Sequence, residues 1–265
     1  MFGIVLKRTF EEFSENFRVA LSFAVLFIFV VLFVFFDQFF LSSGTVFLSL
    51  DTNLLALIGL LVGLVFLYAF SFFVSLCVYT IQRDIHHLSL DDYWNVLMKD
   101  ASLKIFLFYL LFSVVFYILS LVGLFYAQFL VLIAMIIISA LVMYVPQSIV
   151  LEEKSIGASI DESISFWVAN PIVSLGIVAI SSVLLFVILL IEFVFDLLAL
   201  PGIIVSFALV LIILIPFVEQ MKSYAFILKN DLIRAPEVHK ASFHKSVPVK
   251  INATRLHEKH PGGKI

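Results

Sequence analysis

Long uncharged, apolar runs alternate with short polar segments along the chain, and the lengths of these runs predict its elements. A helix crosses the hydrocarbon of a bilayer with about 20 apolar residues at about 1.5 Å per residue. Runs of this kind are 19–36, 52–82, the segment after Asn170-Pro171 and the segment after Pro201-Gly202. Each of them predicts one membrane-spanning helix.

The longest uncharged run, 105–151, predicts two further spans. As a single helix it would be roughly 70 Å long, more than twice the thickness of the hydrocarbon. It therefore predicts a hairpin, and Gly123 and Gln128 mark the region of its turn. The total is six spans.

The polar segments before spans one, three and five share a pattern that predicts a threefold repeat. Serine, an aliphatic residue and two acids coincide in 89–100 and 159–170, and apolar residues recur at helical spacing. Each segment predicts an amphipathic helix in the membrane interface, with Ser159 and Glu162 as a capping box in the third copy. Asn16, Asp100 and Asn170 would then end the three helices.

The predicted fold is all-α, with six transmembrane helices in three hairpins, each preceded by an interfacial helix. Residues 1–230 form one domain with repeats at about 1–82, 83–151 and 152–230. Residues 231–265 form a basic tail that lacks apolar periodicity, and we expect it to be poorly ordered.

Composition excludes the soluble and disordered classes of protein. Hydrophobic residues make up 63% of the 265 residues, charged residues 13%, and Phe occurs 31 times. A soluble domain of this size cannot bury that much apolar surface, and a disordered chain would not contain it.

The charges predict the orientation in the membrane. All 16 Lys and Arg fall before span one, between spans two and three, between spans four and five, or after span six. Positively charged loops stay in the cytoplasm. We therefore expect a multi-pass protein of the cell membrane with both termini in the cytoplasm.

The segment 144–167 carries a resemblance to a known family. A span ends in Pro146, an acidic stretch follows, and an amphipathic helix leads to the next hairpin. This resembles the membrane domain of glycerophosphoryl diester phosphodiesterases and the related YciC-like six-span proteins of unknown function, over about residues 1–230. The resemblance implies six helices in a membrane module without chemistry of its own.

Motifs for chemistry are scarce, so we expect no catalytic, cofactor-binding or metal-binding residues. The sequence has no zinc-protease motif, nucleophile elbow or phosphate-binding glycine loop. His87 and Asp92 have the spacing that glycerolipid acyltransferases use for a base and the carboxylate that orients it. Because Asp92 also suits a helix cap, this enzyme reading is a weak alternative.

Two further pairs are candidates for binding. Glu192 and Asp196 lie one helical turn apart at the outer end of span five, where they could bind a cation or proton, or simply mark the interface. Gly59 and Gly63 form a small-residue motif in span two, which predicts helix packing within the chain or between two copies.

These features favour a non-enzymatic membrane module that acts as a scaffold, a partner subunit or a lipid-organising element. The alternative is a transporter or exporter of a lipid or small amphipathic solute, because transporters often contain internal repeats. The expected partners are the bilayer, anionic lipid at the basic tail, and a protein partner or second copy. The sequence lacks a nucleic-acid-binding pattern.

Overall fold

A computed structural model describes residues 2–15, 17–29, 32, 39–42, 45–48, 54–86, 100–125 and 128–229. In chain order the elements are α1 (Phe2–Glu15), α2 (Phe17–Ser22), the 3₁₀ turn η1 (Phe23–Leu26), β1 (Phe39–Ser42), β2 (Thr45–Leu48), α4 (Leu54–His86), α6 (Ser102–Phe125), α7 (Gln128–Leu141), α8 (Val145–Leu151), α9 (Ile156–Ala169), α10 (Pro171–Leu197), α11 (Gly202–Leu209), the π-helix η3 (Val210–Leu214) and α12 (Ile215–Lys229). Apart from one antiparallel hairpin that pairs Phe39 with Leu48, the described chain is helical.

Five helical segments are long and apolar enough to cross a membrane, as the run lengths predict. They are Leu57–Ile81, Ser102–Gly123, Gln128–Leu151, Pro171–Leu197 and Gly202–Leu228. The first predicted span overlaps a shorter apolar helix, Phe17–Phe29, and most of its second half lies outside the described residues. A helical fold with several helices of membrane-spanning length is therefore confirmed, and the sixth span stays a prediction.

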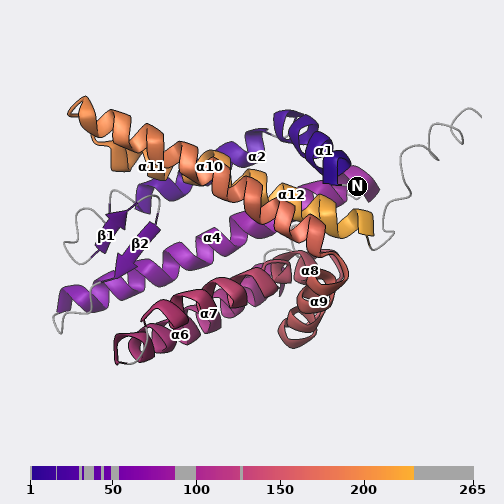
Figure 1. Cartoon of the computed structure of the whole chain (residues 1–265), viewed down its shortest axis with the longest axis horizontal. Helices are drawn as coiled ribbons and strands as arrows, with labels where there is room; N and C mark the ends of the chain where they lie inside the picture. Colours follow the sequence, from indigo (N-terminus) through magenta and orange to yellow (C-terminus); the bar gives the residue numbers. More distant parts are fainter. Residues whose placement is uncertain are drawn as a thin grey trace, which may run out of the picture.

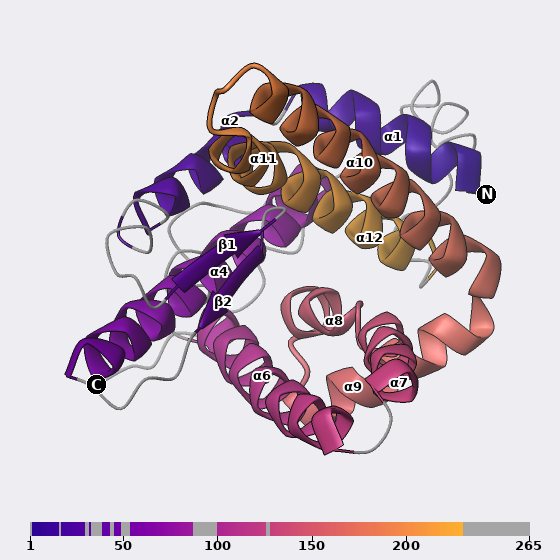
Figure 2. The same cartoon turned by 60° about the vertical axis from the view of Figure 1, so that its left-hand side comes forward.

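The long helices α4, α6, α7 and α10 approach one another at one end of the structure and spread apart toward the other (Figure 1). α1, α8, α9 and the end of α12 lie at one end, and the α6–α7 and α10–α11 turns lie at the other. α4 is central, since it packs against α2, α6, α8 and α12. Figure 2 shows α10, α11 and α12 grouped on one side and α6 to α9 on the other.

Burial is distributed unevenly among the spans. In the most apolar stretch of 202–228, half of the residues are buried. In the corresponding stretches of 102–123 and 171–197, only 11% of the residues are buried. None of the residues of α7 is buried. α6 and α7 therefore expose most of their surface, whereas α8, at the end of the fourth span, is buried.

α1 packs on the protein through the face that was expected to meet lipid. Val5 is fully buried, and the Phe13 ring meets the Phe217 ring edge-on at 5.6 Å. The Phe2 ring occupies the space that a Cβ on Gly176 would need. α1 therefore covers the start of α12 and part of α10.

The predicted capping box at Ser159 and Glu162 is wrong. α9 begins at Ile156 with Ser155 as its N-cap, so Ser159 lies inside the helix. Glu162 instead pairs with Lys154 at 2.9 Å, and Glu152 pairs with the same ammonium at 2.9 Å. The hydrogen bond that Lys154 donates to Glu162, and then the one that it donates to Glu152, raises the pKa of Lys154 above its ordinary value. The stabilisation is complete at neutral pH and is lost only as alkaline pH approaches that raised pKa.

The helix break predicted at the end of the third amphipathic segment is present. Asn170 ends α9 in a non-helical conformation (φ −133°, ψ 53°), and its side-chain amide donates to the Phe166 carbonyl at 3.2 Å. Pro171 then starts α10, where the missing N–H of proline costs nothing. Most of the equivalent second segment lies outside the described residues, so the threefold repeat stays a prediction.

The α10–α11 turn depends on the absence of a side chain at Gly202. Ala199 takes a left-handed conformation (φ 57°), which brings the chain back sharply. The Gly202 N–H donates to Asp196 Oδ1 at 3.0 Å. A Cβ on Gly202 would lie 2.3 Å from the Glu192 carbonyl oxygen, far inside contact distance.

Gly202→Ala should destabilise the protein by at least about 2 kcal/mol, because backbone and not a flexible side chain occupies the space. Unfolding by SDS titration from mixed micelles measures this cost. Gly63→Ala is the control, because a Cβ there meets no described atom within 4 Å, and its stability should change by no more than about 1 kcal/mol. Equal losses in the two variants would contradict the role assigned to the turn.

Candidate functional site

The described part of the bundle contains an ion pair buried inside a membrane-spanning segment. Glu219 and Lys222 lie one turn apart on α12, and the Lys222 Nζ lies 2.6 Å from Glu219 Oε1. The two side chains are only 8% and 9% exposed. Charged groups at such depth are costly, and they mark functional positions often enough to make this pair the candidate site.

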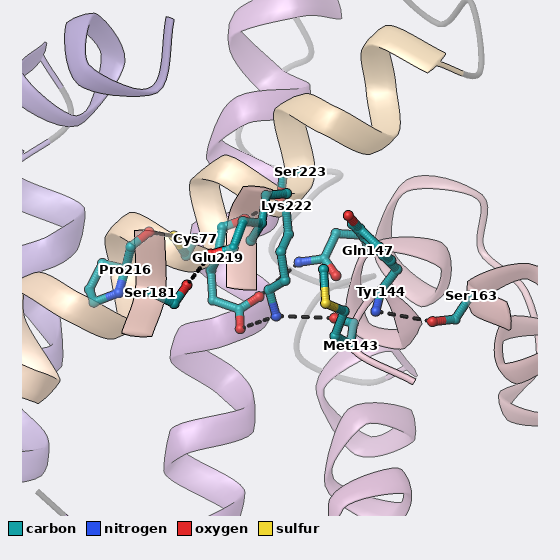
Figure 3. Close-up of polar contacts among 11 residues, drawn as sticks. Cys77, Met143, Tyr144, Gln147, Ser163, Ser181, Pro216, Glu219, Lys222 and Ser223 are labelled. Atoms are coloured by element: carbon teal, nitrogen blue, oxygen red, sulfur yellow. Dashed lines mark hydrogen bonds and ion pairs between the residues drawn. The ribbon is translucent and has the colours of Figure 1, made fainter. Parts of the chain in front are cut away.

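Both residues also reach a second part of the chain, the junction between α7 and α8. The Gln147 amide donates to the other carboxylate oxygen, Glu219 Oε2, at 2.8 Å. Lys222 Nζ donates to the Met143 carbonyl at 3.1 Å. Figure 3 shows Glu219 and Lys222 facing Met143 and Gln147 across the space between the two elements. The pair thus ties span six to span four.

Proline explains why the chain is irregular on both sides of this contact. Residues 142–144 form a turn between α7 and α8, and Pro146 lies in the first turn of α8. In span six, the π-helix η3 ends at Leu214, two residues before Pro216, which has no N–H to donate. Single π turns of this kind are frequent at functional sites.

Neighbouring side chains bind the backbone groups of these irregular stretches. The Cys77 thiol of α4 donates to the Pro216 carbonyl at 3.7 Å. At the other stretch, Ser163 of α9 accepts from the Tyr144 N–H at 3.1 Å and donates to the Leu141 carbonyl at 2.7 Å. Irregular backbone is tolerated at membrane depth only where the protein supplies such partners.

Two buried amide oxygens at the site have no partner among the described residues. They are Gln147 Oε1 and Gln220 Oε1, on side chains that are 0% and 2% exposed. A buried carbonyl without a hydrogen bond costs free energy that water would restore. The closed arrangement therefore leaves polar groups that favour hydration.

The chemistry open to the site is electrostatic. A carboxylate, an ammonium and amides can hold a charge or hydrate, and they can fix one helix to another. Among the described residues, no three His, Cys, Asp or Glu side chains lie close enough to hold a metal ion.

The predicted pair Glu192 and Asp196 lies at the α10–α11 turn. Asp196 accepts the Gly202 N–H and so has a structural role in closing the turn. Glu192 Oε2 is buried and finds no hydrogen-bond partner among the described residues. Binding of a cation or proton by this pair stays a prediction.

The remaining predicted residues are only partly described. Gly59 is buried on α4, whereas the position of a Cβ on Gly63 is open toward every described atom. The contact of Gly63 with a second copy stays a prediction. His87, Asp92 and the basic tail lie outside the described residues.

The sequence reading missed Glu219, Lys222 and Gln147. Charged residues at the end of an apolar run usually mark the interface, so the pattern of 219–229 does not indicate a buried site. A signal was present in the acid and base three residues apart after Pro216 in an apolar run. Their partners on the α7–α8 junction are distant in sequence, so no local pattern could reveal them.

Comparison with known proteins adds no relative: no family, no curated protein and no solved structure matches this chain. The site is therefore interpreted from its own geometry.

Removing one charge of the buried pair should cost far more than removing both. Glu219→Gln or Lys222→Met leaves an unpaired buried charge and should destabilise the protein by about 3–5 kcal/mol. Glu219→Gln together with Lys222→Met leaves neutral groups of similar shape and should cost no more than about 2 kcal/mol. Unfolding by SDS titration, as a double-mutant cycle, measures the coupling.

Glu192→Gln is the matched control, because it neutralises another carboxylate of the membrane-spanning segments at the opposite end of the bundle. Its stability should stay within about 1 kcal/mol of the original. Additive losses in the Glu219/Lys222 cycle would show that the two charges do not depend on each other.

Proposed function

We propose that the chain is a non-enzymatic integral module of the cell membrane that serves as a scaffold, a partner subunit or a lipid-organising element. The observation that carries this proposal is how the bundle uses its polar groups. Glu219, Lys222 and Gln147 tie α12 to the α7–α8 junction, and Tyr144 Oη lies 3.1 Å from Ser174 Oγ in a second tie. Polar groups that link helices stabilise the association of a helix bundle, which suits a structural module in the bilayer.

The lateral surface of the bundle supports the same function. Large apolar side chains are exposed along α6, α7 and α10, among them Tyr117, Ile136 and Phe186. In a bilayer such faces meet lipid chains or the helices of another protein. A module of this shape can therefore organise lipid or hold a partner without a reaction of its own.

The proposed topology has six spans, with both termini in the cytoplasm. Phe17–Phe29, continued into the residues after it, would supply the span that adds to the five long helices. α1 and the end of α12 lie at the same end of the bundle, which agrees with an even number of crossings (Figure 1). The distribution of Lys and Arg assigns that end to the cytoplasm. The threefold repeat belongs to the same proposal.

Single cysteines introduced into a Cys77→Ser background test this topology in intact cells. A cysteine at Lys154 should stay unlabelled by a membrane-impermeant maleimide until the membrane is opened, because the α8–α9 loop is assigned to the cytoplasm. A cysteine at Leu198, in the α10–α11 turn, should be labelled from outside. The reverse pattern would overturn the orientation.

A transporter is the second candidate function, and the interrupted helix of span six favours it. Transporters place broken helices and polar residues inside the membrane. Span six is interrupted by η3 and Pro216, and the buried pair Glu219–Lys222 follows directly. This arrangement would suit a protein that alternates between two states around the site.

Native mass spectrometry of the protein, released gently from its own membranes, separates the two candidates. A scaffold or subunit should carry a second polypeptide in fixed ratio, or a retained shell of lipid. A lone chain that carries one particular solute would favour the transporter and count against the first proposal. Gly63→Ile, measured in parallel, shows whether any dimer depends on the open face of α4.

A further inference from the structure

The cytoplasmic half of span six is built as a separate unit. α11 and α12 are divided by η3, and Pro216 removes one backbone hydrogen bond at the start of α12. A helix interrupted in this way bends at the interruption more easily than a continuous one. α12 can therefore move relative to α11.

The ties that hold α12 to the α7–α8 junction are polar. The Glu219 carboxylate binds the Lys222 ammonium through one oxygen and the Gln147 amide through the other. The same ammonium reaches the Met143 carbonyl. All of these bonds depend on the two charges, so the contact is sensitive to the charge of Glu219.

The closed contact also keeps water away from buried charges and amide oxygens that water would stabilise. Two full charges are desolvated, and Gln147 Oε1 and Gln220 Oε1 have no partner among the described residues. Separation of α12 from the junction would hydrate the ion pair and Gln147 Oε1. The ion pair thus keeps α12 closed, although contact with water would stabilise the buried polar groups.

We propose that this contact is a charge-latched gate at the cytoplasmic end of the bundle. While Glu219 and Lys222 are paired, α12 is closed against the α7–α8 junction. When the pairing is lost, a buried charge is left without its partner, and α12 moves away so that water and small polar solutes enter between α12 and α8. The gate is a moving part of the fold whichever of the two candidate functions holds.

The chain carries its own reporter of this opening. Cys77 is the only cysteine in the sequence and is fully buried. Its thiol donates to the carbonyl of Pro216, one turn before Glu219 on the same helix. A movement of α12 removes that partner and exposes the thiol, so the rate of alkylation reports the fraction of open protein.

The experiment measures alkylation of Cys77 by N-ethylmaleimide in full-length protein in lipid nanodiscs, relative to the same variant denatured in SDS. Glu219→Gln should react at least about tenfold faster than the original protein. Gln147→Met removes the tie between the helices without changing any charge near the thiol, and it should react several-fold faster. Glu219→Gln with Lys222→Met leaves no unpaired buried charge, so it should react several-fold more slowly than Glu219→Gln alone.

Glu192→Gln is the control for the loss of a membrane carboxylate elsewhere, and it should react at the original rate. The gate is overturned if Gln147→Met reacts at the original rate, because faster reaction of Glu219→Gln alone would then reflect only the altered charge around the thiol. It is also overturned if the double variant reacts as fast as Glu219→Gln. If Glu219→Gln does not fold, the alkylation rates of Gln147→Met and of the double variant still test the gate.

Discussion

A charge in a low-dielectric interior must have its partner beside it, and in this protein that requirement governs the junction of three helices. Glu219 binds Lys222 on its own helix and Gln147 across the bundle, at 2.6 and 2.8 Å. The loss of either charge would strand the other away from water, which costs more than the pair itself contributes. A few polar atoms therefore fix the position of α12 relative to α8 and to the turn between α7 and α8. The apolar packing around them follows that position.

The same constraint explains how proline is accommodated in two spans. Backbone groups in hydrocarbon cannot turn to water, so each irregular stretch is placed where another helix supplies a partner. Cys77 of α4 binds the Pro216 carbonyl, and Ser163 of α9 binds both Tyr144 and Leu141. α4 and α9 thus stabilise the irregular stretches of α12 and of the α7–α8 junction. Both stretches lie next to the ion pair. Two irregular stretches of backbone, the buried ion pair and the unpaired oxygen of Gln147 therefore lie close together.

The distribution of burial fits this division of roles. Span six carries the ion pair and is the most enclosed, whereas α6 and α7 are uncharged along their apolar runs and face outward. A bilayer reverses the arrangement of a soluble protein, because lipid accepts apolar side chains and the protein interior must take the polar ones. The outward surface is then available to lipid or to a partner helix, and the inner contact is available for movement.

The sequence by itself determined the elements that depend on local properties. Run length predicted the spans, the excessive length of 105–151 predicted a hairpin, and Asn170-Pro171 and Pro201-Gly202 predicted helix starts, because proline and the supply of apolar residues act over one or two turns. The capping box at Ser159 failed because Ser155, four residues earlier, starts the helix instead. Only the tertiary structure decided which span is enclosed, that α1 lies on α12, and that Glu219 meets Gln147, which is 72 residues away. These are contacts between distant segments, and the pattern of polarity that predicts a span carries no information about which neighbour it will meet.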